Sequence, residues 1–435
     1  MHHFITAPVL RAMGIPLPQQ KFIVHLLSLW PCVRGRFNFT NLSRYSSSHE
    51  RRFRRGFGKD FDWLDLNRRL LTMIIPCHHE LIAAMDASFI PKSGKCTPGV
   101  GWFFNGCASR TEKGLEASTV ALIDLTAHTA YGLSVRQTPA SRPSEEGTKK
   151  KEKSGVKGKR AAVAPRAEKG GTTGQSDGES RLDFYLRHLR EVRPYFPALV
   201  RHLAVDGYYT SRTFVDGALA LELDVVGKLR RDASLCHVYS GPQKARGRRR
   251  VRGEKISWKS LDLSLWRNEG EIEKGTRLFS LDVFHNSLKR VIKVALLERK
   301  TDKGVSRVLL FSTDLALSGK QIVDYYRSRF QIEFLFRGCP LGRTKGSMGL
   351  NHCQSRQSKA IDFHWNASLS ALNLAKWQEQ RCTHKKSFSA DSYKMKNNNE
   401  LLLQAFSIGL GLDLNAVKSH PTYQSLCNIG AGGLH

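Results

Sequence analysis

The stretch from Ser318 to Arg337, SGKQIVDYYRSRFQIEFLFR, has the pattern of a single amphipathic helix. Ser318 and Gln321 have the spacing of a capping box, in which each side chain bonds a free amide at the helix start. One apolar stripe at helical spacing is formed by Val323, Tyr326, Phe330 and Phe334. This spacing predicts a helix that packs its stripe against a core.

Glu333 lies beside this stripe, four residues after Arg329. Side chains four apart share one helix face, and an exposed Arg–Glu pair is the ordinary interpretation of such a spacing. A carboxylate on the shoulder of a core-facing helix can instead point into a cleft. The rest of the chain decides between these two interpretations.

The charge of the chain restricts its partners. Its 435 residues include 69 lysines and arginines against 38 acidic residues, a formal charge of +31. Such a field favours a polyanion, and nucleic acid is the first candidate. An acidic membrane surface would require an anchor, and the longest apolar run, Phe22 to Trp30, is far shorter than the roughly 20 residues of a membrane span. We therefore expect no membrane partner.

The nine cysteines contain no CxxC pair and follow no regular spacing. An odd, scattered set is typical of reduced thiols rather than of a disulfide framework or a zinc site. We expect a cytoplasmic protein associated with the nucleoid.

A chain of this length is expected to form more than one lobe. We expect a helical DNA-binding domain at 1–75, a first core part at 76–229, a mainly β insertion at 230–315, a second core part at 316–380 and a helical tail at 381–435. The segment at about 139–180 is rich in Lys, Gly, Ser and Thr, and is expected to be a disordered basic insert.

Two basic segments are candidate DNA contacts. The first lies in the expected helix Ser47 to Phe57, and its basic residues are Arg51, Arg52, Arg54 and Arg55. A helix-turn-helix unit that holds DNA phosphates and a merely solvated basic helix explain these residues equally well. The second is the run KARGRRRVRGEK, whose central residues are Arg248, Arg249 and Arg250. On so basic a chain, DNA contact is the favoured interpretation of this run.

Two aspartates sit where aspartate is unusual. Asp86 lies within the apolar strand-like segment LIAAMDASFIPK, although Asp is depleted in strands. Asp206 ends the apolar run Leu203 to Val205 and precedes Gly207 and a helix. This order places a carboxylate at the carboxyl edge of a parallel sheet, where α/β proteins build their sites, although a simple helix-capping role remains the alternative.

The expected order of elements is β-β-β-α-β-α-β, an insertion, and a helix, which is a ribonuclease-H-like α/β layout. Such a core would bring Asp86, Asp206 and Glu333 together. Three crowded carboxylates repel one another unless hard divalent cations neutralise them, and Mg²⁺ or Mn²⁺ suits ligands that are all oxygen. Two such ions, roughly 3.5–4 Å apart, can activate a nucleophile and stabilise the leaving oxygen in phosphodiester transfer.

Five separated blocks then resemble one known family. Tyr326, Arg329 and Glu333 match a signature of Tyr, two residues, Arg, three residues, Glu, six residues and Lys. The other matching blocks are MDASFIPKSG, AVDGYY, GLNHCQSR, and the pair NFTNLSRY and NASLSALNLAK. The chain resembles insertion-sequence transposases of the DDE class over almost its whole length. This family carries a β-rich insertion before its Glu.

The resemblance implies the chemistry and its partners. Asp86, Asp206 and Glu333 would be catalytic and hold two Mg²⁺ ions, with Mn²⁺ as a substitute. Tyr326 and Arg329 would contact the DNA end. The enzyme would nick double-stranded DNA at the element's terminal inverted repeats and join the ends to target DNA. Because two ends must be paired, self-assembly on DNA is expected.

One position departs from the signature, because Pro340 stands where its Lys belongs. Lys345 or Arg343 is a candidate to contact the DNA phosphate that the signature Lys would contact. The alternatives are a catalytically impaired relative that binds element ends without cleaving them, and a structure-directed nuclease of the same fold. Trp102 and Trp258 are candidates for stacking on a displaced base, although core packing is the favoured interpretation of both.

Overall fold

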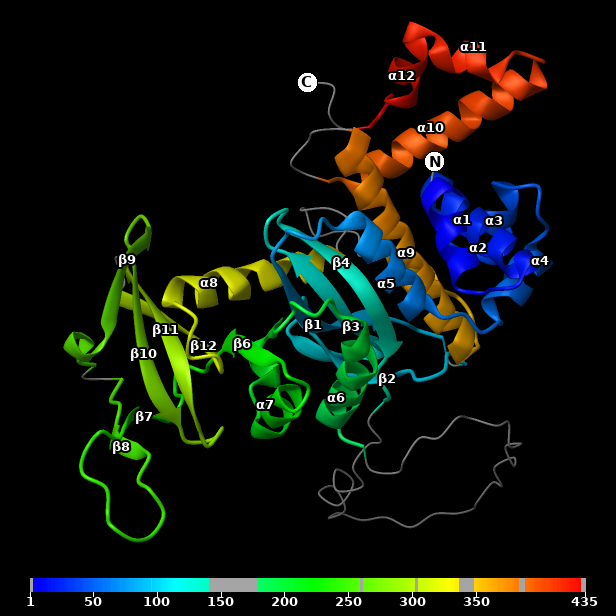
Figure 1. Cartoon of the computed structure of the whole chain (residues 1–435). Coiled ribbons are helices and arrows are strands. Elements are labelled where there is room, and N and C mark those ends of the chain that lie inside the picture. Colours follow the sequence, from blue (N-terminus) through cyan, green and yellow to red (C-terminus); the bar gives the residue numbers. More distant parts are fainter. Residues whose placement is uncertain are drawn as a thin grey trace, which may run out of the picture.

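The computed structural model describes residues 3–94, 96–140, 179–258, 261–301, 304–335, 348–382 and 388–431. Most of the insert expected at about 139–180 lies outside these ranges, as do Pro340, Arg343 and Lys345. The described residues form a mixed α/β protein built around one large sheet, with helices on its faces and at its ends (Figure 1).

The sheet has twelve strands within the described residues. Their bounds are β1 (Leu81–Pro91), β2 (Gly101–Asn105), β3 (Arg110–Asp124), β4 (Thr129–Gln137), β5 (His202–Ala204), β6 (Asp224–Lys228), β7 (Leu235–Val238), β8 (Arg252–Lys255), β9 (Arg267–Glu273), β10 (Thr276–His285), β11 (Arg290–Thr301) and β12 (Gly304–Ser312). The order along the sheet is β2-β3-β1-β5-β6-β12-β11-β10-β7-β8, with β4 paired to β3 and β9 paired to β10.

Helices precede, interrupt and follow the strands. The amino-terminal group comprises α1 (His3–Ala12), α2 (Leu17–Leu29), the 3₁₀ turn η1 (Trp30–Cys32), α3 (Phe39–Arg44), α4 (Glu50–Phe57) and α5 (Trp63–Ile74). The central ones are α6 (Arg181–Val192), η3 (Arg193–Tyr195), η4 (Gly207–Tyr209), α7 (Arg212–Leu219), η5 (Leu263–Leu265), α8 (Gly319–Ser328) and η6 (Arg329–Leu335). The last are η7 (Leu350–His352), α9 (Ser358–Cys382), α10 (Ala390–Gly409), α11 (Leu414–Ser419) and α12 (Pro421–Cys427).

Strand β1 is the junction of the sheet. It pairs antiparallel with β3 along its whole length and parallel with β5. Strands β5 and β6 continue the parallel part. An antiparallel meander joined to short parallel strands, with helices between them, is the expected ribonuclease-H-like layout, and the predicted fold class is confirmed.

The β-rich segment between β6 and α8 extends the same sheet. Its last strand, β12, pairs with β6 on one side and with β11 on the other. Figure 1 shows α8 running along these strands towards the meander, and α8 packs against β6, β10, β11 and β12. The insertion is therefore connected to the core through backbone hydrogen bonds and through α8.

Helix α9 covers β4 with polar side chains. The Asn366 amide donates to the Val135 carbonyl at 3.0 Å and accepts from its N–H at 3.2 Å. Asn373 forms the same pair of bonds with the backbone of Gly132, at 2.7 and 3.0 Å. Backbone groups left unpaired in a buried position would cost about 1–3 kcal/mol each, so these amides replace a further strand.

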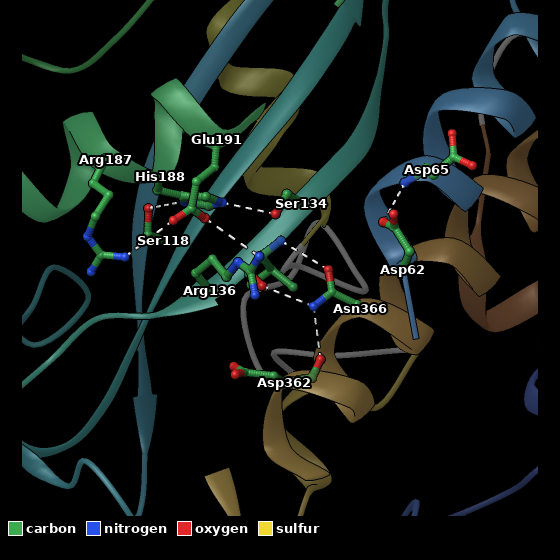
Figure 2. A network of polar contacts seen from close by, with 11 residues as sticks. Asp62, Asp65, Ser118, Ser134, Arg136, Arg187, His188, Glu191, Asp362 and Asn366 are labelled. Atoms are coloured by element: carbon green, nitrogen blue, oxygen red, sulfur yellow. Dashed lines mark hydrogen bonds and ion pairs between the residues drawn. The ribbon is translucent and has the colours of Figure 1, made fainter. Parts of the chain in front are cut away.

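Helix α6 is attached to strands β3 and β4 by a buried histidine. His188 lies between Ser118 of β3 and Ser134 of β4, with both ring nitrogens 3.0 Å from a hydroxyl oxygen (Figure 2). Burial lowers the pKa of His188 to about 3, with Arg136 and Arg187 adding to the effect. The ring is therefore neutral at physiological pH and acts as a fixed hydrogen-bonding bridge.

The single helix predicted from Ser318 to Arg337 is wrong in one respect. Ser318 and Gln321 do form the predicted capping box, but α8 ends at Ser328 and the chain tightens into the 3₁₀ turn η6. With about three residues per turn, a different face points inward. Ile332 and Leu335 are buried, whereas Phe330 and Phe334, predicted in the stripe, are 44% and 40% exposed.

Two smaller expectations also differ. Helix α4 begins at Glu50 and not at Ser47, and its N-cap is His49, whose ring accepts from the Arg51 amide. The glycine-bounded segment Gly99 to Gly106 contains β2. Trp102 on that strand is 63% exposed, so core packing is wrong for it. Trp258 is half-buried and donates to the Ala233 carbonyl at 3.0 Å.

Candidate functional site

Asp86 lies in the middle of β1, opposite Thr119 of β3, and is half-buried. Burial raises the pKa of Asp86 from its ordinary value of 3.8 to about 7. The Arg329 cation opposes this shift, and the carboxylates of Glu333 and Asp206 add to it. The three acids are therefore close enough to influence one another electrostatically.

Asp206 reaches this place because of strand register. Ala84 of β1 is level with Ala204 of β5, so Asp86 and Asp206 each lie two residues beyond a paired position. A two-residue step keeps the side chain on the same face of a sheet. The backbone of Asp206 is extended, at φ −78° and ψ 167°, and its exposed carboxylate accepts from the Gly207 amide at 2.7 Å.

Glu333 arrives on η6, which packs against β1, β3 and β4. Its carboxylate lies 3.8 Å from the guanidinium of Arg329, and the two side chains are 20% and 11% exposed. This is the Arg–Glu pair anticipated from the sequence, but it faces the aspartates and not bulk solvent. The Nε of Arg329 is buried and has no hydrogen-bond partner among the described residues.

Tyr326 connects the arginine to Asp206. The guanidinium of Arg329 lies 5.5 Å from the centre of the Tyr326 ring. Burial raises the pKa of the Tyr326 phenol, and both Arg329 and Asp206 act on it electrostatically. The signature Tyr, Arg and Glu therefore lie around the two aspartates.

The donor set fits hard divalent cations, since it consists of carboxylate oxygens. In the structure the positive charge beside Asp86 and Glu333 comes from Arg329. The oxygens of the three acids have not converged to coordination distance, and in the described ranges only His202, Asp224 and Asp314 have. The nearest cation to these acids among the described residues is therefore Arg329, whose buried Nε has no hydrogen-bond partner there.

The sequence did not indicate several polar residues, some beside these acids and others at the opposite end of β5. The Thr119 hydroxyl, opposite Asp86, is buried without a hydrogen-bond partner in the described part of the chain, and so is the Tyr209 hydroxyl. His202 and Asp224 begin adjacent strands, and this pairing was the available signal for the group that they form with Asp314. No motif distinguishes Thr119 from other strand threonines.

The basic residues named from the sequence lie on the surface. On α4, Phe53 is buried while the four flanking arginines are exposed, namely Arg51, Arg52, Arg54 and Arg55. Arg248, Arg249 and Arg250 line a groove of about 740 Å³ together with Arg252 and Lys289. The guanidinium of Arg250 lies 4.4 Å from the centre of the Tyr239 ring. Both surfaces present cations to a polyanion.

Comparison with known families now identifies the class of protein. Residues 33–274, more than half of the chain, match the DDE superfamily endonuclease. The chain therefore belongs to the DDE superfamily, whose domains have a ribonuclease-H-like fold. Residues 178–374 match the transposase DDE domain, so this is a DDE-class transposase domain, and nuclease activity and DNA binding follow from the family. Among curated proteins there is no match.

The first match includes Asp86 and Asp206, and the second includes Asp206 and Glu333. Enzymes of this superfamily use divalent metal ions.

Across the described residues, the helices are too short or too polar to cross a bilayer.

The raised pKa of Asp86 predicts a pH dependence of metal binding. Below about pH 7 a cation must displace a proton from Asp86, so Mg²⁺ affinity should fall, by up to about tenfold per pH unit between about pH 7 and pH 5. Without metal, the folded state holds this proton more tightly than the unfolded chain. The free energy of unfolding attributable to Asp86 should therefore decrease as pH rises from about 4 to about 7.

Isothermal titration with Mg²⁺ and urea unfolding across this range measure both effects. Asp86→Asn should remove the two pH dependences, while the exposed control Asp232→Asn should keep them. Unchanged pH profiles in Asp86→Asn would contradict the assignment.

Proposed function

We propose that this protein is an insertion-sequence transposase that nicks DNA at the element's terminal inverted repeats and joins the ends to target DNA. One observation carries the proposal: Asp86, Asp206 and Glu333, from three distant parts of the chain, lie close enough to act on one another electrostatically beside the neighbouring strands β1 and β5. Asp86, Asp206 and Glu333 would hold two Mg²⁺ ions, or Mn²⁺. When bound, these ions would supply Lewis-acid stabilisation of the phosphate and activation of a nucleophile.

Two residues of η6 and α8 would position the DNA end. Arg329 can offer its unpaired Nε to a phosphate oxygen, because charge-assisted bonds from guanidinium to phosphate are strong and directional. This movement would release Asp86 and Glu333 from the cation that lies beside them. Tyr326 would stack on a base or bond the same phosphate. Lys345, outside the described residues, is proposed as a further phosphate contact.

Isosteric substitutions of the acids test the proposed catalytic role. Asp86→Asn, Asp206→Asn and Glu333→Gln should each lower nicking of terminal-repeat DNA by at least about a thousandfold, because each removes a charged ligand that stabilises the transition state by several kcal/mol. Gel shifts should show that DNA binding remains. The matched control is Asp232→Asn, on an exposed side chain. Equal nicking by all three variants and the parent would refute the assignment.

The match to DDE superfamily endonucleases also favours a second candidate, a nuclease that cuts without strand transfer. A target-plasmid assay separates the possibilities. Joined products indicate a transposase, and nicked ends alone indicate a nuclease. End-specific binding without cleavage indicates an impaired relative, for which Pro340→Lys with a shortened 338–348 segment is the informative rescue.

The basic residues would hold the DNA through its backbone. If Arg248, Arg249 and Arg250 each contact a phosphate, replacing all three with Ala should weaken binding to any sequence and lower the slope of log K against log salt by up to about 2.7. Fluorescence anisotropy between low and moderate salt measures the slope. Three exposed cations outside both basic segments, substituted as Arg190→Ala, Arg201→Ala and Lys418→Ala, provide a charge-matched control for surface changes elsewhere. An unchanged slope would remove the loop from the DNA path, leaving Arg51, Arg52, Arg54 and Arg55 as the proposed contacts.

The carboxy-terminal helices offer a surface for the proposed self-assembly on paired ends. Large apolar residues there are 48–65% exposed, namely Leu402, Phe406, Ile408, Leu410 and Leu412. Residues 399–431 contain two acidic residues and one lysine, on a chain of charge +31. A near-neutral apolar face is where two strongly basic copies can meet without opposing like charges, and Figure 1 shows these helices projecting from the body.

Sedimentation with terminal-repeat DNA tests this surface. The parent should be a monomer alone and hold two DNA ends per two chains in the complex. Leu402→Ser with Phe406→Ser should bind single ends but not pair them. Leu199→Ser, at an exposed apolar position outside the surface, is the control. Normal pairing by the double variant would exclude this interface.

A further inference from the structure

A second group of metal-ligating side chains lies at the other end of β5. His202 begins β5, Asp224 begins β6, and Asp314 follows β12. One donor atom from each lies within 4.8 Å of the other two. Because extended chain rises about 3.3 Å per residue, His202 is about 13 Å from Asp206, at the opposite end of the strand. This group is therefore separate from the three acids of the proposed catalytic site.

Hydrogen bonds from outside the group orient both carboxylates. Asp224 Oδ1 accepts from the Thr313 hydroxyl at 2.7 Å, and that hydroxyl accepts from the Val225 amide at 2.9 Å. Asp314 Oδ1 accepts from the Ala316 amide at 2.8 Å, while its Oδ2 lies 3.0 Å from His202 Nε2. Outer partners of this kind fix ligand orientation at metal sites. Each carboxylate thus has one oxygen held by its surroundings.

The charges and accessibility suit a small cation. The side chains of His202 and Asp314 are 18% and 25% exposed, so an ion has access without being in bulk water. Two carboxylates and a neutral imidazole balance a divalent charge. Lys293 is the basic residue that acts on Asp314, and it is itself 3.6 Å from Asp282. Lys293 therefore forms its ion pair with Asp282, outside the group of three ligands.

We propose that His202, Asp224 and Asp314 form a structural site for a first-row divalent transition metal such as Zn²⁺. Imidazole and carboxylate together favour these ions, whereas Mg²⁺ prefers oxygen ligands alone. The ion would bridge His202 Nε2 and Asp314 Oδ2, which lie 3.0 Å apart. It ties the starts of β5 and β6 to the connection that leads into α8.

The site also supports α8. The Tyr325 ring of α8 lies 5.2 Å from the His202 ring, and its hydroxyl donates to Glu80. The next residue along the helix is Tyr326, and Arg329 follows one turn later. A bound ion that holds His202 in place would therefore also hold α8, which leads to the candidate DNA contacts Tyr326 and Arg329. The ion itself would lie away from the three acids of the proposed catalytic site.

Mn²⁺ is a suitable probe, because its electron spin detects coordinated nitrogen. The experiment uses the full chain with Asp86→Asn, Asp206→Asn and Glu333→Gln, so that the oxygen-only site is removed. Pulsed electron paramagnetic resonance should show ¹⁴N modulation from one imidazole. Equilibrium dialysis should find about one Mn²⁺ or Zn²⁺ per chain.

His202→Gln should remove the ¹⁴N modulation, and Asp224→Asn should weaken binding at least about tenfold. The control His237→Gln should change neither. Circular dichroism confirms that each variant is folded. Absence of ¹⁴N modulation in the parent, or its persistence in His202→Gln, would overturn the proposal and leave a histidine–carboxylate ion pair. Neither result depends on whether the protein cuts DNA.

Discussion

The structure depends on a short parallel pairing between β1 and β5. Two residues on each strand are in register, Ala83 with Leu203 and Ala84 with Ala204. This pairing joins the antiparallel meander to the rest of the sheet, and it also sets Asp86 level with Asp206. A slip of one residue would turn one aspartate to the other face, because side chains alternate along a strand. The fold and the candidate site therefore rest on the same few hydrogen bonds.

The candidate site combines three carboxylates with one nearby cation, the guanidinium of Arg329. Three carboxylates are close together, and Arg329 supplies the cation that makes this tolerable in the described structure. The same guanidinium has a buried donor without a partner among the described residues. Under the proposed function, a DNA phosphate would accept from this donor, and divalent ions would neutralise the acids in place of the guanidinium. The tight turn of η6 holds Arg329 and Glu333 in this position.

Much of this organisation could be predicted from the sequence, for identifiable reasons. Asp86 and Asp206 stood out because an acid within or directly after an apolar strand is rare, and the capping box at Ser318 follows from local chemistry. The change to a 3₁₀ turn at Arg329 could not be predicted, because packing against β1, β3 and β4 decides it. The exposure of Trp102 and the meeting of His202 with Asp314 likewise depend on contacts between residues far apart in sequence.

The continuity of the sheet through the insertion has a consequence for scale. Six strand spacings of about 4.8 Å, or about 29 Å along the sheet, separate β5 from β8. One turn of duplex DNA spans roughly 34 Å. The arginine-rich loop before β8 and the strand that leads to Asp206 thus belong to one continuous sheet. Under the proposed function, a duplex bound at this loop would be held by the same sheet that positions the acids.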